Sequence, residues 1–355
     1  MSFKVHVTPS GHEFNVEPGE VVLEAALRAG HPFPYGCRNG SCGSCKGKVL
    51  EGALDYGVYQ AKALSDAERA MGYALFCQAK PLSDLRVEVC EVHSAAGVVV
   101  KILPCRVEKL EQLTHDVVRV FLKLPATERL QFLAGQYIDI LMRDGCRRSF
   151  SIANAPHDDK FIELHIRMVE GGRLTGDVFS AFKEKAILRI QGPLGNFYLR
   201  EDSDRPVIFI AGGTGFGPIK AIIEHAIAQN STRPMHLYRG VRAKRDLYLE
   251  ELTSIWKTHL PHFTYTQVLS QPLPEDHWQG RRGYVAQAVL EDFADVREYE
   301  VYASGPPAMV QTAHTALVER GLPPEHFYAD PFEFAQDSAP GVQVEDVFTA
   351  KTPRI

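Results

Sequence analysis

Residues 37–45 read Cys-Arg-Asn-Gly-Ser-Cys-Gly-Ser-Cys, and this stretch decides the fold of the first part of the chain. Its three cysteines follow the spacing Cys-x4-Cys-x2-Cys, and a fourth, Cys77, lies further along. The residues between the cysteines are small or flexible, so their backbone amides can approach sulfur atoms. Clustered cysteines in a chain without a secretion signal point to metal binding or catalysis rather than to disulfides.

The cysteine spacing is that of a plant-type [2Fe-2S] cluster, in which each iron takes two thiolates. A zinc site or four buried free thiols are the alternatives, and a lone Cys-x2-Cys would favour zinc as much as iron. Three cysteines in one loop, placed after a predicted hairpin and helix, favour the cluster. The predicted ligands are Cys37, Cys42, Cys45 and Cys77. Three further cysteines are predicted to be buried or incidental thiols, namely Cys90, Cys105 and Cys146.

The segments around this loop predict a small mixed domain. Residues 3–16 alternate as a hairpin, residues 20–29 form a short helix, and Ser65 to Glu68 is a capping box that opens a second helix. This pattern resembles the plant-type ferredoxin domain, a β-grasp fold, over residues 1–93. That range holds nine Lys and Arg against eleven Asp and Glu, a net charge of −2, and so lacks a strongly acidic face.

Residues 101–200 show mainly short strands separated by turn residues, which predicts a small antiparallel barrel. One strand carries Arg148-Ser149-Phe150-Ser151. An arginine fork suits a diphosphate, an aromatic ring can lie against a flavin, and a serine hydroxyl can hydrogen-bond flavin N5. The motif resembles the Arg-x-Tyr-Ser motif of the ferredoxin–NADP reductase superfamily, with Phe in place of Tyr. The alternative is a plain barrel strand.

The resemblance implies that the barrel binds FAD. Arg148 would bind its phosphate, Phe150 would pack on the flavin and Ser151 would contact N5. A glycine-containing loop before a predicted helix at 177–182 matches the superfamily's diphosphate loop, although it could also be a plain helix cap. The loop residues implied by the resemblance are Gly172, Arg173, Leu174 and Thr175.

From residue 205 strands alternate with helices, which predicts a parallel sheet covered on both faces. A glycine loop follows the apolar strand 207–211 and opens a helix, the context in which glycines and a helix N-terminus receive a pyrophosphate. It matches the superfamily's Gly-Gly-Thr-Gly-x-x-Pro loop. The predicted nicotinamide-coenzyme residues there are Gly212, Gly213, Thr214, Gly215, Gly217 and Pro218.

Two further motifs complete the predicted coenzyme site. Ser304-Gly305-Pro306 resembles the start of the superfamily motif that brings nicotinamide against the flavin, with Ser304 in place of Cys. Phe332, in a segment that resembles the superfamily's C-terminal strand, would cover the flavin face, and its alternative role is a core aromatic. The predicted catalytic residues are therefore Ser151, Ser304 and Phe332.

The coenzyme is expected to be NADH from the resemblance, with NADPH possible. No acidic residue ends the second strand of the predicted sheet, where residues 238–242 include Arg239 and Arg242. These arginines could meet a 2′-phosphate, meet the pyrophosphate, or be solvated.

The order of the three modules, 1–93, 101–200 and 205–335 with a tail at 336–355, resembles the reductases of bacterial oxygenases and the CDP-6-deoxy-Δ3,4-glucoseen reductases. The stretches 147–156 and 283–292 look most like the latter. The resemblance implies electron transfer from NADH through FAD and the [2Fe-2S] cluster to a partner protein. That partner would be a pyridoxamine-phosphate-dependent sugar dehydrase or an oxygenase component. A nucleotide-binding redox sensor without turnover is the alternative of another class.

The composition excludes several other classes. A net charge of −5 and a pI of about 6.3 argue against a nucleic-acid partner. No uninterrupted apolar stretch is long enough to span a membrane, and the start of the chain has no secretory pattern, so a cytoplasmic protein is expected. A monomer is expected as well. No acid–base dyad, nucleophile triad or zinc-protease motif is present, so we expect no carbon chemistry from the chain itself.

Overall fold

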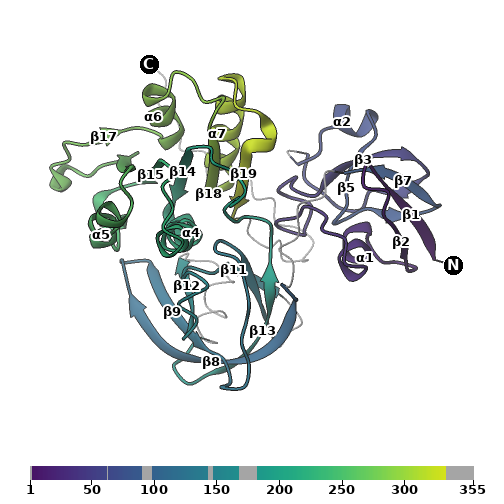
Figure 1. The fold of residues 1–355 in the computed structure, drawn as a ribbon, viewed down its shortest axis with the longest axis horizontal. Helices are drawn as coiled ribbons and strands as arrows, with labels where there is room; N and C mark the ends of the chain where they lie inside the picture. The colour runs from purple at the N-terminus through teal and green to yellow at the C-terminus, as the bar shows by residue number, and fades with distance from the viewer. Residues whose placement is uncertain (1, 62, 90–97, 143–146, 168–181, 333–355) are drawn as a thin grey trace, which may run out of the picture.

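The computed structural model describes residues 2–61, 63–89, 98–142, 147–167 and 182–332. Three bodies follow one another along the chain, an N-terminal mixed sheet, a barrel and a parallel α/β sheet (Figure 1). The predicted multidomain fold class is therefore confirmed. The predicted tail, Cys90, Cys146 and the loop 172–175 lie outside the described residues.

The N-terminal body is built on a five-stranded sheet in the order β2-β1-β7-β3-β5, in which only β1 and β7 run parallel. This is the mixed sheet expected of a β-grasp fold. Its elements are β1 (Phe3–Thr8), β2 (Glu13–Val16), α1 (Val22–Arg28), β3 (Lys46–Glu51), β4 (Leu54–Asp55), α2 (Asp66–Ala70), β5 (Tyr73–Leu75), β6 (Lys80–Pro81) and β7 (Leu85–Glu88).

Local sequence accounts for these elements. Val5 and Val7 alternate into the core of β1 and are fully buried. At α2 the Ser65 hydroxyl accepts from the Glu68 amide at 3.3 Å, while Glu68 accepts from the Ser65 amide at 2.8 Å. The predicted capping box is therefore present, and it satisfies backbone groups that the helix start would leave unpaired.

The second body is a closed antiparallel barrel. The strand order is β11-β10-β13-β8-β9-β12, and an antiparallel bridge between Ile152 and Leu164 joins its two ends. The predicted barrel is confirmed, but the sequence analysis did not predict β13. Its strands are β8 (Lys101–Gln112), β9 (Val117–Lys123), β10 (Tyr137–Leu141), β11 (Arg147–Ser151), β12 (Ile162–Arg167) and β13 (Ile187–Leu194).

The third body is a six-stranded parallel sheet in the order β17-β16-β15-β14-β18-β19. Its elements are β14 (Val207–Gly212), η1 (Gly213–Gly215), α4 (Phe216–Ala228), β15 (Met235–Val241), η2 (Lys244–Asp246), α5 (Glu251–His259), β16 (Phe263–Leu269), η3 (Pro274–Asp276), β17 (Arg281–Arg282), α6 (Val285–Asp292), β18 (Glu300–Gly305), α7 (Pro307–Glu319), η4 (Pro324–His326) and β19 (Phe327–Pro331).

The order in which strands are added to this parallel sheet reverses at β14. The chain moves outward through β15, β16 and β17, then returns to place β18 on the other side of β14. Ligands of open parallel sheets bind beyond the carboxyl ends of the strands at such a reversal. The ends of β14 and β18 are Gly212 and Gly305, which belong to the two predicted coenzyme motifs.

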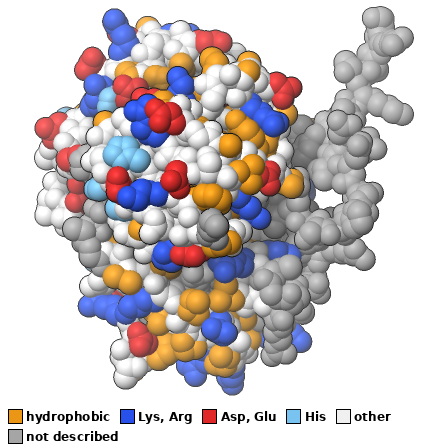
Figure 2. Space-filling model, turned by 90° about the vertical axis from the view of Figure 1, so that its right-hand side faces the viewer, with side chains coloured by type: hydrophobic (Ala, Val, Ile, Leu, Met, Phe, Trp, Pro, Cys, Tyr) orange, Lys and Arg blue, Asp and Glu red, His pale blue; other side chains and the backbone are white. Residues whose placement is uncertain are grey.

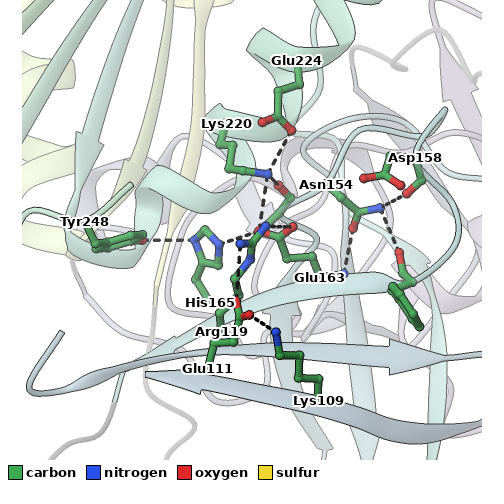
Figure 3. Close-up of polar contacts among 12 residues, drawn as sticks. Lys109, Glu111, Arg119, Asn154, Asp158, Glu163, His165, Lys220, Glu224 and Tyr248 are labelled. Carbon is green, nitrogen blue, oxygen red and sulfur yellow. Dashed lines mark hydrogen bonds and ion pairs between the residues drawn. The ribbon is translucent and has the colours of Figure 1, made fainter. Parts of the chain in front are cut away.

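A buried ionic network fixes the barrel to α4 (Figure 3). The Lys220 ammonium donates to the Ala153 carbonyl at 3.0 Å and lies 3.4 Å from a Glu163 oxygen. Arg119 and His165 also contact Glu163, each at 2.8 Å. Burial alone would raise the pKa of Glu163, but the His165 hydrogen bond and the charges of Lys220 and Arg119 outweigh it and hold that pKa well below its usual value.

The exposed side of the N-terminal body carries Lys, Arg, Asp and Glu side chains interspersed with apolar ones (Figure 2). This mixture agrees with the small net charge of −2 counted for residues 1–93.

Within the residues that the structure describes, none of the helices combines the length and the apolar character that crossing a bilayer requires.

Candidate functional site: two modules that meet at one carboxylate

The cysteine loop lies between α1 and β3, and Cys77 follows β5. The loop folds so that amides face sulfur, because the Cys37 amide donates to Cys42 Sγ at 3.3 Å and the Ser41 amide donates to Cys37 Sγ at 3.4 Å. The Gln78 side-chain amide adds a longer contact of 3.9 Å to Cys77 Sγ. These donors suit thiolates that keep negative charge.

The four sulfurs form two pairs. A hydrogen bond from Cys42 lowers the pKa of Cys37 to about 5 and raises that of Cys42. In the same way a hydrogen bond between Cys45 and Cys77 raises the pKa of Cys45 and lowers that of Cys77. Two pairs of thiols match a cluster whose two irons take two thiolates each. Among the described residues no group of three or more His, Cys, Asp and Glu surrounds a single metal position.

The predicted flavin motif lies on β11, which pairs with β10 in the barrel. The Phe150 ring is half-buried against the barrel core, with its centroid 6.0 Å from that of Phe182. Arg148 Nη1 donates to the Arg147 carbonyl at 3.0 Å. An arginine and a half-exposed ring two positions apart share one strand face, which fits a diphosphate and a planar ring system.

The predicted coenzyme loop begins at the end of β14 and enters α4. The helix begins at Phe216, so Gly217 and Pro218 lie in its first turn and Thr214 lies in η1. A Cβ on Gly215 would lie 2.1 Å from the Ser304 carbonyl oxygen. The loop and the start of the second motif therefore pack backbone to backbone, which only glycine permits.

The second motif lies at the end of β18. Ser304 is fully buried, whereas Pro306 is exposed and begins the turn into α7. Gly305 has φ +137°, and a Cβ there would lie 2.6 Å from the Gly212 carbonyl oxygen. The two predicted motifs thus meet at the reversal of the strand order, although 92 residues separate Gly213 from Gly305.

Asp330, which the sequence analysis did not single out, joins the flavin strand to the coenzyme motif. The Ser151 hydroxyl donates to Asp330 Oδ2 at 3.0 Å, and the Ser304 hydroxyl donates to the same oxygen at 3.3 Å. Burial raises the pKa of Asp330 to about 6, and the two hydroxyl donors oppose that rise. A carboxyl that titrates near neutral pH can exchange a proton during turnover.

Phe332 follows β19 and is hydrogen-bonded to the coenzyme motif. Its amide donates to the Gly305 carbonyl at 2.9 Å, and its side chain is partly exposed, so it is not a fully buried core aromatic. Asp330 lies two residues before Phe332, in the same segment that resembles the superfamily's C-terminal strand, but only its residue type marked it in the sequence. The pairing of β18 with β19 shows which residue of that segment reaches the serines.

Arg239 is not solvated, which was one of the three roles considered for it. It is fully buried, its guanidinium lies 3.8 Å from the Phe216 ring centroid, and it pairs with Glu250 at 2.7 Å. Arg242 is exposed and lines a cavity of about 210 Å³ together with Arg167. Arg167, also missed, lies over the coenzyme loop, because a Cβ on Gly213 would be 2.9 Å from its Nη1.

Family models match each of the three bodies. A 2Fe-2S iron-sulfur cluster binding domain matches residues 5–82, an oxidoreductase FAD-binding domain matches residues 104–198, and an oxidoreductase NAD-binding domain matches residues 209–315. The iron–sulfur assignment sets aside the zinc and free-thiol alternatives. The three cofactors predicted from the sequence, FAD, a nicotinamide coenzyme and [2Fe-2S], are confirmed at the level of these domains.

Relatives and solved structures match nearly the whole chain. The CDP-6-deoxy-L-threo-D-glycero-4-hexulose-3-dehydrase reductase of Yersinia pestis is 37% identical over 94% of this chain and 99% of its own length. The reductase subunit of an aromatic O-demethylase from Amycolatopsis sp. is also 37% identical, over 94% and 99%. The crystal structure of the Amycolatopsis cytochrome P450 reductase GcoB covers 93% of this chain and 98% of its own, with 36% identity and a TM-score of 0.78.

These matches are to reductases, and they include the three modules in the same order. Together with the thiol pairs and the serines that converge on Asp330, they set aside the sensor alternative. The chain belongs to the family of NAD(P)H-dependent flavin and iron–sulfur reductases in which a plant-type ferredoxin domain precedes a ferredoxin-reductase-like FAD and NAD module.

Proposed function

We propose that this reductase takes electrons from NADH and delivers them singly to a pyridoxamine-phosphate-dependent dehydrase that holds a CDP-sugar adduct. The observation that carries the electron-transfer part is the convergence of Ser151 and Ser304, from two modules, on Asp330. The similarity over 94% of the chain to the Yersinia dehydrase reductase supports the choice of acceptor.

When bound, FAD accepts a hydride at N5 and the [2Fe-2S] cluster carries one electron, so together they connect a two-electron donor with a one-electron acceptor. The chain would hold these groups with residues already described. The cluster would take Cys37, Cys42, Cys45 and Cys77. FAD would take Arg148, Phe150, Ser151 and, from the loop outside the described residues, Gly172, Arg173, Leu174 and Thr175. The coenzyme would take residues 212–215, 217, 218 and 304–306.

Asp330 would control the direction of the hydrogen bond that Ser151 offers. While Asp330 is ionised, the Ser151 hydroxyl donates to it, so the serine oxygen would present a hydrogen-bond acceptor to a bound flavin. Once Asp330 is protonated, it can donate to the serine, whose own hydroxyl then turns outward as a donor. Ser304 completes the pair of donors that keeps the carboxylate ionised near neutral pH.

The remaining residues would exclude water and place the coenzyme. Phe332 would lie over the flavin face, held by the hydrogen bond from its backbone amide to the Gly305 carbonyl, until nicotinamide displaces it. The glycine contact between Gly215 and Ser304 would keep the pyrophosphate loop and the nicotinamide motif at a fixed spacing. NADH rather than NADPH is proposed from the family resemblance. We further propose a cytoplasmic monomer.

The test uses the purified holoprotein. We expect an absorption spectrum with flavin and iron–sulfur bands, and NADH-dependent reduction of ferricyanide and cytochrome c. The acceptor is then tested with the dehydrase encoded nearest to the gene, loaded with its CDP-sugar substrate. Turnover of that dehydrase at a kcat/KM at least tenfold above that for an oxygenase component supports the proposal, and the reverse ratio contradicts it.

Delivery to an oxygenase component is the second candidate. Its support is that reductases of this kind are as similar to the chain as the dehydrase reductases are, with 35% identity to the phenol 2-monooxygenase reductase component of Pseudomonas sp. over 96% of the chain. The same acceptor comparison decides between the two candidates.

A further inference from the structure

Tyr137 connects the flavin strand region of the barrel with the cluster loop of the N-terminal domain. Its hydroxyl donates to the Gly36 carbonyl at 2.8 Å, a contact that spans 101 residues of sequence. The residue is 8% exposed, and burial raises the pKa of its phenol well above the usual value. The hydroxyl therefore stays protonated and able to donate throughout the physiological pH range.

The Gly36 end of this hydrogen bond lies against the cluster ligands. Gly36 directly precedes Cys37 in the chain. A Cβ on Gly36 would lie 3.3 Å from Cys42 Sγ and 3.1 Å from Ser44 Oγ, so the backbone of Gly36 packs closely on the sulfur environment. A displacement of the Gly36 carbonyl would therefore move the Cys37 and Cys42 pair.

The Tyr137 end lies beside the residue proposed to contact the flavin. Tyr137 and Ser151 are cross-strand partners in the pairing of β10 with β11. In the next strand, Leu194 is the partner of Tyr137, and both residues are part of the same hydrophobic cluster as the core of the N-terminal domain. The backbone of Tyr137 is therefore part of a barrel strand, whereas its side chain packs with the core of the ferredoxin domain.

The rest of this contact is also built from specific interactions. The Gly195 backbone hydrogen-bonds the Tyr35 phenol, and the Asn196 side-chain amide donates to the Phe33 carbonyl at 3.4 Å. The Gln136 side-chain amide in turn donates a hydrogen bond to the Gly195 carbonyl at 3.0 Å. Residues 33–36 are therefore held from the barrel at several points, with Tyr137 as the closest to the cysteines.

We propose that Tyr137 is a positioning residue for electron transfer between FAD and the [2Fe-2S] cluster. The inference rests on the proposed function. By fixing the Gly36 carbonyl, Tyr137 keeps the Cys37 and Cys42 side of the cluster loop docked on the barrel. Each transfer oxidises the reduced flavin by one electron and reduces one ferric iron to ferrous iron, so one NADH supplies two such events.

The test compares Tyr137→Phe with Tyr265→Phe in the holoprotein. The control removes a hydroxyl that also makes a 2.8 Å hydrogen bond, in its case to Glu250, far from the cluster loop in the sequence and in another body. Anaerobic rapid mixing with NADH measures flavin reduction and cluster reduction separately, and hydrogen–deuterium exchange of residues 33–45 measures docking without any turnover.

In Tyr137→Phe we expect cluster reduction to slow about tenfold relative to flavin reduction, and the amides of Phe33, Tyr35 and Gly36 to exchange about tenfold faster. A tenfold change corresponds to ~1.4 kcal/mol, in the range for one buried hydrogen bond. Tyr265→Phe should change neither quantity by more than about twofold. Asn196→Ala, which loosens the same segment without touching Tyr137, should shift both quantities in the same direction by a smaller factor.

The inference is overturned if Tyr137→Phe matches the unmodified protein in both measurements, or if flavin and cluster reduction slow by equal factors. It is also overturned if Asn196→Ala loosens residues 33–36 while cluster reduction keeps its rate, because docking would then not control the transfer. A failure of the proposed function looks different, since the unmodified protein would then not reduce its own cluster with NADH.

Discussion

Ser151 and Asp330 are 179 residues apart in the chain, yet the Ser151 hydroxyl donates to the Asp330 carboxylate at 3.0 Å. One residue belongs to the barrel and the other to the last strand of the parallel sheet. The hydrogen bond therefore joins the proposed flavin site to the proposed nicotinamide site across the boundary between two bodies. Its strength depends on the ionisation of Asp330, which makes the site sensitive to pH.

Asp330→Asn should remove that sensitivity. In the unmodified protein the pKa of Asp330 is about 6, so the carboxylate is ionised above pH 6 and protonated below it. We expect the rate of flavin reduction by NADH to change across this value, and the change to be absent in Asp330→Asn. At pH 7.5 the variant should be slower by about tenfold or more, because hydrogen bonds to a charged group contribute ~1.5–3 kcal/mol. Anaerobic stopped-flow between pH 5.5 and 8 measures this.

Asp295→Asn is the matched control for Asp330→Asn. Asp295 is exposed, and hydrogen bonds from Arg297 hold its pKa at about 2, so it is ionised throughout the measured range. Its pH profile should match that of the unmodified protein. An inflection near pH 6 that survives in Asp330→Asn would assign the titration to another group.

Ser304→Ala should move the inflection rather than abolish it. The Ser304 hydroxyl donates to Asp330 and so lowers its pKa, which means that its removal raises that pKa above 6. The inflection of flavin reduction should therefore shift to higher pH, with a loss of rate of about fivefold at pH 7. Ser304→Cys should give a smaller shift, since a thiol is a weaker donor. A shift to lower pH would contradict the assignment.

Lys220→Met should destabilise the junction of the barrel and α4. The change leaves Glu163 and Glu224 without the ammonium that now lies 3.4 and 2.9 Å from them. Loss of one partner of a buried pair costs ~3 kcal/mol, which should lower the unfolding temperature by roughly 6–12 °C. The exposed Lys244→Met is the control. Differential scanning calorimetry measures both, and equal melting temperatures would mean that the network adds no stability.

The same network predicts how stability varies with pH. Burial lowers the pKa of His165 below its ordinary 6.5, and the pKa of Glu163 is also held down. The unfolded chain therefore binds more protons than the folded one as the pH falls below about 6.5, and the unfolding temperature should fall with it.

Arg239→Met should lower the stability of the fold without changing the preference between NADH and NADPH. Because Arg239 is buried over Phe216 and paired with Glu250, we expect a lower unfolding temperature, but a ratio of kcat/KM for NADH to NADPH within about twofold of the unmodified protein. Arg242→Met, at an exposed residue of the same strand end, should leave the unfolding temperature unchanged. A large change in the ratio of kcat/KM for NADH to NADPH in Arg239→Met would instead indicate that Arg239 contacts the 2′-phosphate of NADPH.

Cys45→Ser and Cys105→Ser test the ligand assignment with two equally buried thiols. Cys45 is 2% exposed and Cys105 is 3% exposed. Cys45→Ser should lose the iron–sulfur absorption and the bound iron, whereas Cys105→Ser should keep both. Burial raises the pKa of Cys105 to about 12, so it stays a neutral thiol and a poor metal ligand. Loss of iron from both variants would mean that folding rather than ligation is at fault.

Parts of this structure that depend on neighbouring residues could be predicted from the sequence. Three predicted features each lie within about ten consecutive residues: the spacing of the first three cysteines, the capping box at Ser65 and the glycine loop after β14. The contacts of Asp330 and Tyr137 could not be predicted, because their partners Ser151 and Gly36 lie 179 and 101 residues away in the chain and are brought to them by the packing of separate bodies. The strand β13 was missed since Gly192 and Pro193 interrupt its alternation. The burial of Arg239 could not be predicted either, because its contacts with Phe216 and Glu250 depend on how the helices pack on the sheet.

The shared packing of Tyr137 and Leu194 with the ferredoxin core limits how freely this module can be exchanged. A chimera that replaces residues 1–93 with another ferredoxin would leave the Tyr137 and Leu194 side chains without the apolar core against which they now pack. A graft would succeed only if the incoming module also carried a carbonyl and an apolar recess where residues 33–36 now lie. The unit that can be exchanged intact therefore includes the start of β10 and the end of β13 as well as the N-terminal domain.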